Sequence, residues 1–388
     1  LSDVVKKIRG KAGTQVRLKI LRKEGEQTRR VEVSLLRAKV NLEDEAASIT
    51  YIDKTIKGES KKIGIINLPS FYADSRRNGR SSAEDVKKLI KEAKTKNISG
   101  LVLDLSTNGG GSLNDAVQLA GLFFKTGNVV KQSSKSKSRE EIALADTDPT
   151  VDWNGPLVVL TSRISASASE IVSGTLKDYQ RAIIVGGDHT FGKGSVQQVV
   201  PITGNLGALK VTVGMFYIPG GKSTQHGGVE ADVVLPGAFS NDEMGEKSLD
   251  YSLPPTTIAS FVSKSAYVPE GADRWLPIRT EWIKPLQEKS KKRVEQNKEF
   301  QKIIAEVEKA KKRGKLMKVS DILNDKSEKE KIDKQKAKRT MSKDEKTAEY
   351  LKRPDIEEAS LVLIDLMEIE GTPTVGVTVN SETSEKHN

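Results

Sequence analysis

Short apolar runs separated by helical patterns dominate the middle of the chain. Residues 63–68, 101–105 and 157–160 are rich in isoleucine, leucine and valine and are bounded by turn residues. Each run therefore predicts a buried strand. Apolar residues at helical spacing follow each strand, and the segment Ser82 to Asp85 resembles a capping box that would begin the first helix. Strands that alternate with helices predict an α/β core.

The flanks of this core have other patterns. Residues 16–20 and 31–35 alternate apolar with polar side chains, which predicts a β-hairpin that is too small to fold alone. Residues 40–62 are mixed and polar, so we expect an irregular strand and a linker there. Residues 125–155 predict a surface excursion, and residues 209–217 alternate as a further strand. From residue 241 onward the pattern becomes helical and highly charged.

The stretch from Pro156 to Gln198 carries the most distinctive chemistry. Ser165, Ser167 and Ser169 lie between a predicted strand and a helix that begins near Glu170. Serines at such a place commonly cap the helix. A sharp turn of this kind also exposes a hydroxyl beside unpaired N–H groups, and a nucleophilic serine needs both.

Lys193 changes the balance between these two interpretations. It lies between two glycines at the entry of an apolar strand, where a lysine that only aids solubility is unexpected. A lysine that loses solvation near apolar backbone can accept a serine proton near neutral pH. Gln197, four residues later, could hydrogen-bond the amine and orient it. Ser/Lys pairs are a known nucleophile–base arrangement.

A glycine triplet, residues 109–111, follows the strand that ends in Leu105 and precedes another helix. Three glycines allow close approach of the backbone and present N–H groups to a ligand. The spacing and the Walker lysine of a phosphate loop are missing. Half of an oxyanion hole beside the serine turn fits the triplet better.

Composition narrows the function classes only slightly. The chain has 388 residues, 36% of them hydrophobic, and this length predicts two or three domains. It has no cysteine, so it uses neither disulfides nor thiolate chemistry. No apolar run approaches the roughly 18 residues of a membrane span. The first residue is Leu1, and we expect the true N-terminus to lie upstream.

Most of the net charge of +11 comes from one segment. Residues 288–353 contain 23 Lys and Arg against 13 Asp and Glu. A basic segment raises the question of nucleic acid. Acidic residues are mixed throughout and few aromatic residues interleave, so we expect solvated amphipathic helices and no nucleic-acid binding. The predicted inward positions are Val294, Phe300, Ile303, Ile304 and Val307.

Taken together, the motifs LVLDLSTNGGGSL, SASASEIVSG, KDYQRAIIVG and TFGKGSVQQ resemble those of the tail-specific, or C-terminal processing, periplasmic serine proteases. That resemblance covers nearly the whole chain. It implies a ClpP/crotonase-like ββα core over residues 63–240, preceded by the C-terminal part of a PDZ domain (1–39) and a linker (40–62). Residues 241–388 would then form a basic helical C-terminal domain.

The resemblance also implies the roles of individual residues. Ser167 would be the nucleophile, Lys193 the base and Gln197 the residue that orients it. The oxyanion donors would be the N–H of Ala168 and one from Gly110 or Gly111. No cofactor or metal is implied.

The implied substrates are proteins with exposed apolar C-terminal ends, in the bacterial periplasm. The family leaves room for an adaptor protein and for peripheral association with the inner membrane. Two departures stand out. The turn at residues 186–190 is one residue longer than the family pattern, and Ser106 stands where the family tends to have arginine.

Other carriers of catalysis are weaker candidates. His189 could pair with Ser167, although a solvated turn residue beside Asp188 is the simpler interpretation. Asp104, at the end of a strand, is expected to be structural. With three histidines and no cysteine, a metal site is not expected.

Three function classes remain open on the sequence. They are a serine endopeptidase, an inactive peptidase-fold PDZ scaffold or binding protein, and a crotonase-type acyl-CoA enzyme. Retention of Ser167, Lys193 and Gln197 favours the first of these classes.

Overall fold

The computed structural model describes residues 7–8, 10–24, 27–37, 46–56, 58–74, 79–134, 141–203, 207–240, 244–313 and 342–371. The chain divides into two compact units, Leu1–Ala46 and Ala47–Asn388. In the first unit β1 (Gln15–Glu24) and β2 (Gln27–Leu36) pair antiparallel, with Gln15 opposite Leu36. The alternating pattern thus predicted this hairpin correctly.

A six-stranded sheet forms the centre of the second unit. Its order is β12 (Val233–Val234), β9 (Ile183–Gly186), β8 (Leu157–Thr161), β5 (Gly100–Asp104), β4 (Glu59–Asn67) and β3 (Ser48–Ile56). Neighbouring strands are parallel except for β3, which pairs antiparallel with β4 at the edge. The three strands predicted from apolar runs are therefore β4, β5 and β8.

Of the irregular strand and linker expected over residues 40–62, the strand is present, but it is regular and leaves no linker in the second half of this segment. Residues 48–56 form β3, and β4 already begins at Glu59. The polar composition misled because β3 is an edge strand with several partly or fully exposed positions, so its side chains need not be apolar. Residues 38–45 lie outside the described residues.

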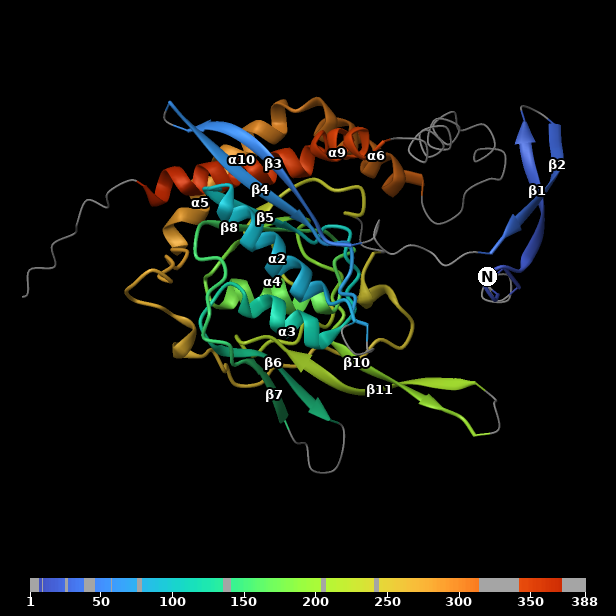
Figure 1. The fold of residues 1–388 in the computed structure, drawn as a ribbon, viewed down its shortest axis with the longest axis horizontal. Coiled ribbons are helices and arrows are strands. Elements are labelled where there is room, and N and C mark those ends of the chain that lie inside the picture. Colours follow the sequence, from blue (N-terminus) through green and yellow to red (C-terminus); the bar gives the residue numbers. More distant parts are fainter. Residues whose placement is uncertain are drawn as a thin grey trace, which may run out of the picture. The chain divides into compact units, whose positions relative to one another are not determined.

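Helices cover both faces of the sheet (Figure 1). Side chains alternate along β8, so that Leu157 and Val159 join one buried cluster and Val158 and Leu160 join the other. The first cluster includes residues of α2 (Ser82–Thr95), α3 (Leu113–Gly121) and α4 (Ala168–Asp178). The second includes residues of α5 (Thr280–Gln296), α6 (Lys298–Arg313) and α10 (Pro354–Glu370). Strands buried on both faces are largely apolar, as β5 and β8 are except at their last residues, Asp104 and Thr161.

The first of these helices begins one residue earlier than the predicted capping box. Ser81 is the N-cap of α2, and its hydroxyl accepts a hydrogen bond from the N–H of Glu84. Ser82 is instead fully buried and donates to Asp115. The sequence favoured this register, because Ser81 is followed three residues later by Glu84, the usual residue of a capping box, whereas Ser82 is followed by Asp85.

A second, four-stranded sheet has the order β10 (Ser195–Pro201), β11 (Ala208–Tyr217), β6 (Gly127–Ser134) and β7 (Glu141–Asp146). Residues 125–155 therefore hold two paired strands rather than only a surface excursion. Residues 135–140 between these strands lie outside the described residues.

The basic helices belong to the same compact unit as the sheet, so the boundary expected near residue 240 does not separate two units. Val294 and Phe300 are buried against the second cluster, and Ile303 is partly buried against it. Two single-turn 3-10 helices (Glu246–Ser248 and Lys264–Ala266) and α9 (Lys343–Leu351) complete the described part, and residues 314–341 lie outside it. The basic helices are amphipathic, and their apolar faces pack against the sheet while their charged faces remain outside.

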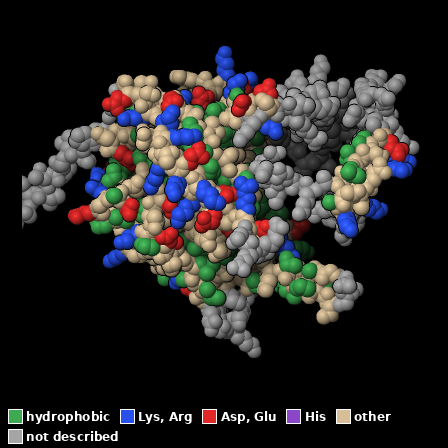
Figure 2. Space-filling view, in the orientation of Figure 1, with side chains coloured by type: hydrophobic (Ala, Val, Ile, Leu, Met, Phe, Trp, Pro, Cys, Tyr) green, Lys and Arg blue, Asp and Glu red, His purple; other side chains and the backbone are tan. Residues whose placement is uncertain are grey.

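Charges of both signs are interspersed on the face of the molecule that Figure 2 shows. Many lysines of the helices have acidic neighbours, as in the 2.8 Å ion pair between Lys289 and Asp365. Within the described residues, no helix has both the length and the apolar character needed to cross a membrane.

Candidate active site

Ser167 occupies the sharp turn between β8 and α4. It is the N-cap of α4, with φ 57° and ψ −110°. A positive φ is uncommon for a residue with a side chain and is found at strained functional turns. A serine on a strained strand-to-helix turn presents its hydroxyl away from the backbone beside the first N–H groups of the helix.

The two neighbouring serines have structural roles. Ser165 and Ser169 are fully buried, whereas Ser167 is partly exposed. The Ser165 hydroxyl donates to the carbonyl of Leu105 at 2.8 Å, and the Ser169 hydroxyl donates to the carbonyl of Asn108 at 2.8 Å. Both serines therefore fasten the serine turn to the turn that follows β5. Ser167 is the one of the three that is accessible to a substrate.

The glycine turn lies directly against this serine. A Cβ at Gly110 would lie 2.9 Å from the Cβ of Ser167 and 3.2 Å from the nitrogen of Ala168. Gly110 also has φ 102°. Only glycine permits this approach, because a side chain here would enter the space of the serine turn.

The N–H groups of the turn are not equivalent. The N–H of Gly110 donates to the side-chain oxygen of Asn108 at 2.8 Å, so it is already engaged. Within the described residues, the N–H groups of Gly111 and Ala168 donate no hydrogen bond. Of the two glycines predicted as oxyanion donors, Gly111 is therefore the one whose N–H is available. It can form an oxyanion hole together with the N–H of Ala168.

Lys193 reaches the same region from the loop before β10. Its N–H donates to Glu170 at 2.9 Å, and its ammonium nitrogen lies 3.4 Å from the amide oxygen of Gln197. The pairing of β10 with β11 is irregular between Val196 and Gln197. An irregularity of this kind re-aims the side chains beside it. The structure thus brings Lys193 and Gln197 into contact.

Glu170 is a site residue that the sequence interpretation missed. Its buried carboxylate accepts four hydrogen bonds, from the N–H groups of Ser167, Gly192 and Lys193 and from the hydroxyl of Thr190, at 2.6 to 2.9 Å. Burial raises its pKa to about 7, although the four donors favour the anion. A detectable signal was present, because Ser167 and Glu170 have the spacing of a capping box.

The longer turn at residues 186–190 is held by its own contacts. Arg163 forms two hydrogen bonds of 2.6 Å with the carboxylate of Asp188, and these bonds lower the pKa of Asp188 below its usual value. The N–H of Thr190 donates to the carbonyl of Val229. These contacts hold the turn in place before the loop reaches Lys193.

His189 is turned toward a different part of the molecule. Its Nδ1 lies 2.6 Å from the carbonyl oxygen of Thr190, and its side chain lines a cavity together with His226 and Glu230. Ser167 does not line that cavity. This placement favours Lys193 over His189 as the partner of Ser167. Within the described residues, no group of three or more His, Cys, Asp or Glu side chains is arranged to hold a metal ion.

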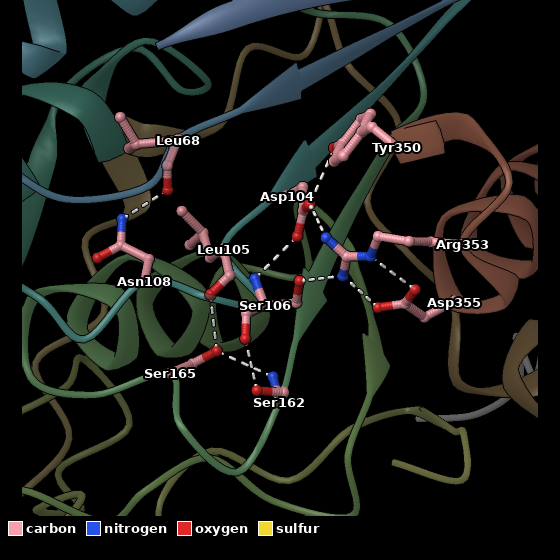
Figure 3. A network of polar contacts seen from close by, with 10 residues as sticks. All are labelled: Leu68, Asp104, Leu105, Ser106, Asn108, Ser162, Ser165, Tyr350, Arg353 and Asp355. Carbon is pink, nitrogen blue, oxygen red and sulfur yellow. Dashed lines mark hydrogen bonds and ion pairs between the residues drawn. The ribbon is translucent and has the colours of Figure 1, made fainter. Parts of the chain in front are cut away.

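Asp104 and Ser106 receive a group that lies far away in the sequence. Arg353, between α9 and α10, donates to the hydroxyl oxygen of Ser106 at 2.7 Å and lies 3.4 Å from the carboxylate of Asp104 (Figure 3). Tyr350 donates to the same carboxylate at 2.8 Å. Asp104 thus lies in a polar network at the end of β5, the strand that leads into the glycine turn.

Residues 62–235, which include every site residue except Tyr350 and Arg353, match the sequence profile of Peptidase family S41. This segment belongs to peptidase family S41. The chain is 40% identical over 260 residues to the tail-specific protease of Haemophilus influenzae, which covers 65% of this chain and 35% of that protein. It is 32% identical over 236 residues to the carboxy-terminal-processing protease of Bartonella bacilliformis, covering 61% of this chain and 50% of that protein.

The chain therefore spans half or less of the length of these two relatives. Among solved structures, the photosystem II D1 C-terminal processing protease matches this chain with a TM-score of 0.46 and 27% identity, covering 63% of this chain and 64% of that one.

Proposed function

We propose that this chain is the catalytic part of a serine endopeptidase that processes or degrades proteins with exposed apolar C-terminal tails. The observation that carries the proposal is that the N–H groups of Ser167 and Lys193 both bind the buried carboxylate of Glu170, while the glycine turn lies directly against Ser167. The names of the two bacterial relatives, a tail-specific and a carboxy-terminal-processing protease, support action at C-terminal tails, and the apolar character of those tails is proposed on the family resemblance.

The chemistry follows from the positions of these groups. Neutral Lys193 accepts the proton of the Ser167 hydroxyl while the serine oxygen attacks the scissile carbonyl carbon. The N–H groups of Ala168 and Gly111 stabilise the oxyanion of the tetrahedral intermediate. The protonated lysine then gives its proton to the departing amine, and the C–N bond breaks to leave an acyl-enzyme.

Hydrolysis of the acyl-enzyme repeats these steps with water. Lys193 takes a proton from the water molecule, the hydroxide attacks the ester carbonyl, and the proton returns to the Ser167 oxygen as it leaves. Gln197 keeps the amine aimed at the serine through the contact at 3.4 Å. Every proton removed is returned, so the residues named suffice for one catalytic cycle.

The remaining proposals concern the parts outside the S41 segment. Residues 1–39 would be the end of a PDZ domain, which the β1–β2 hairpin supports, and that domain would capture the substrate tail. A periplasmic location is likewise a proposal, and it rests on the family resemblance of the motifs. An adaptor protein and peripheral contact with the inner membrane are further proposals on the family resemblance alone.

The decisive experiment compares single serine substitutions on one quenched fluorescent peptide that has an apolar C-terminal end. Ser167→Ala should abolish cleavage, whereas the matched Ser165→Ala should keep a measurable rate, although it loses the bond to Leu105. Normal cleavage by Ser167→Ala would assign the nucleophile elsewhere. A wild-type protein that binds the peptide without cutting it would instead identify an inactive scaffold.

A further inference from the structure

A buried carboxylate ends β5, and its partners come from the C-terminal helices. Asp104 is 1% exposed, and burial raises the pKa of its carboxyl group while the charge of Arg353 opposes this effect. Tyr350 donates to one oxygen of this carboxylate. Removing one partner of a buried charge is strongly unfavourable because the charge is left without compensation. Arg353 and Tyr350 therefore fix the end of this strand.

The guanidinium of Arg353 also reaches the first residue of the next turn. One terminal nitrogen faces Asp104 while the other donates to the hydroxyl oxygen of Ser106, and the N–H of Ser106 donates to the other oxygen of Asp104 at 2.8 Å. Arg353 is itself held by the carboxylate of Asp355 (Figure 3). The planar fork of an arginine suits such a two-sided contact, and a lysine could not reproduce it.

Two hydrogen bonds lead from this turn to the serine turn. The carbonyl of Ser106 accepts from the hydroxyl of Ser162 at 2.5 Å, and the carbonyl of Leu105 accepts from the hydroxyl of Ser165 at 2.8 Å. Ser162 and Ser165 belong to the loop between β8 and α4 that presents Ser167. A displacement at Leu105 or Ser106 is therefore passed to the segment that carries the nucleophile.

We propose that Arg353, assisted by Tyr350, is a positioning residue for catalysis. Its guanidinium holds the backbone of residues 104–106 so that the glycine turn and Ser167 keep their mutual geometry. The segment that carries Tyr350 and Arg353 thereby supports an active site whose proposed catalytic residues lie between Gly110 and Gln197. This inference rests on the proposed peptidase function, because positioning has an effect on rate only where there is a reaction.

Arg353→Met tests the proposal against an ordinary anchoring role, and Arg293→Met is its matched control. Both arginines are 30% exposed and pair with carboxylates on or near the C-terminal helices, but Arg293 binds Glu358 and Asp365, away from the turn. We expect Arg353→Met to lower kcat about tenfold or more, with KM within about twofold of wild type. Arg293→Met should lose stability and keep its kcat. Equal kcat for both variants and wild type overturns the proposal.

Moving the arginine from position 353 to position 106 tests whether the lost activity can be restored. In the double variant Ser106→Arg with Arg353→Ser, a guanidinium from the turn itself can reach Asp104, because the shortened side chain at 353 leaves room. We expect this variant to recover several-fold in kcat over Arg353→Met. Tyr350→Phe removes only a hydroxyl and keeps the ring, so it remains informative should Arg353→Met fail to fold. A wild-type kcat in Tyr350→Phe together with no recovery in the transfer variant contradicts the proposal.

Hydrogen–deuterium exchange separates a failure of this inference from a failure of the proposed function. Amides of residues 105–112 should exchange about tenfold faster in Arg353→Met than in Arg293→Met, whether or not the protein cleaves any peptide. Unchanged exchange in this segment refutes the positioning role. Faster exchange in Arg353→Met, together with a wild-type protein that cleaves no peptide, would refute the peptidase proposal alone.

Discussion

The backbone N–H groups of Ser167 and Lys193 donate to the same oxygen of a carboxylate, that of Glu170, at 2.7 and 2.9 Å. The turn that presents the proposed nucleophile and the loop that presents the proposed base are thereby joined at one atom. Neither residue can move far without breaking a bond to a group that is fully buried. The geometry of the Ser/Lys pair therefore depends on a residue that touches no substrate.

Glu170→Gln should change the pH dependence of stability. Burial raises the pKa of Glu170 from 4.5 to about 7 in the folded state, so between these values the native protein binds the proton more tightly than the unfolded chain does. Its contribution to the free energy of unfolding is then largest below pH 4.5 and falls as pH rises through 7. We expect wild type to lose about 2 to 3 kcal/mol relative to the glutamine variant between pH 5 and pH 8.

Urea unfolding of both proteins at several pH values measures this difference. Asp188→Asn is a useful comparison, since Arg163 lowers the pKa of Asp188 and its contribution should instead be lost as pH falls. A difference between wild type and Glu170→Gln that stays constant from pH 5 to pH 8 would show that Glu170 keeps an ordinary pKa.

Gly110→Ala should impair catalysis far more than Gly109→Ala. A methyl group at residue 110 would lie 2.7 Å from the carbonyl oxygen of Ala166 and would also require a positive φ for alanine. A methyl group at Gly109 meets nothing within 4 Å. Since the contact at 110 displaces the serine turn itself, we expect kcat to fall about a hundredfold for Gly110→Ala and to change by less than about threefold for Gly109→Ala.

Peptide cleavage rates and thermal unfolding of the two glycine variants decide this point. Similar rates for both would mean that the close approach of Gly110 to Ser167 has no catalytic role. The same conclusion would follow if Gly110→Ala unfolded at a lower temperature than wild type but kept full activity below that temperature.

The local parts of this site could be predicted from the sequence, and the distant parts could not. Ser167 and the glycine triplet each lie at the end of an apolar strand with a helix behind it, and this pattern is complete within about 20 residues. Glu170 was overlooked although its spacing from Ser167 was informative. Arg353 lies 247 positions after its partner Ser106, and no pattern along the chain connects an arginine between two helices to a turn that far away.

In the fold, too, some elements could be recognised from the sequence and others could not. Strands β4, β5 and β8 are buried on both faces and are therefore apolar, which made them recognisable. β3 was expected only as an irregular strand beside a linker, because an edge strand is held by backbone pairing with β4 and this pairing does not require an apolar composition. The C-terminal helices were expected as a separate domain because their high charge hides the narrow apolar face that α5, α6 and α10 place on the sheet.

A chain shortened to begin at Val40 should lose selection of substrate more than it loses chemistry. The removed residues contain the β1–β2 hairpin, which lies in a compact unit of its own, whereas every proposed catalytic residue lies in the other unit. We expect KM for a peptide with an apolar tail to approach that for the same peptide with a charged tail, while kcat stays within about threefold of the full chain. Undiminished preference for the apolar tail would place tail recognition in the second unit.

The identity of the general base can be decided by the pH dependence of the rate. An amine must be neutral to accept the serine proton, so the cleavage rate of the wild-type protein should rise with pH through one ionisation. Lys193→Arg keeps a cation of similar reach, but arginine does not release its proton near neutral pH, so this variant should be inactive. His189→Ala should keep the wild-type profile, because His189 contacts the carbonyl of Thr190 and lines a cavity that excludes Ser167. Measuring all three profiles on one peptide separates the two candidates: an active Lys193→Arg, or a folded but inactive His189→Ala, would transfer the role of base from Lys193 to His189.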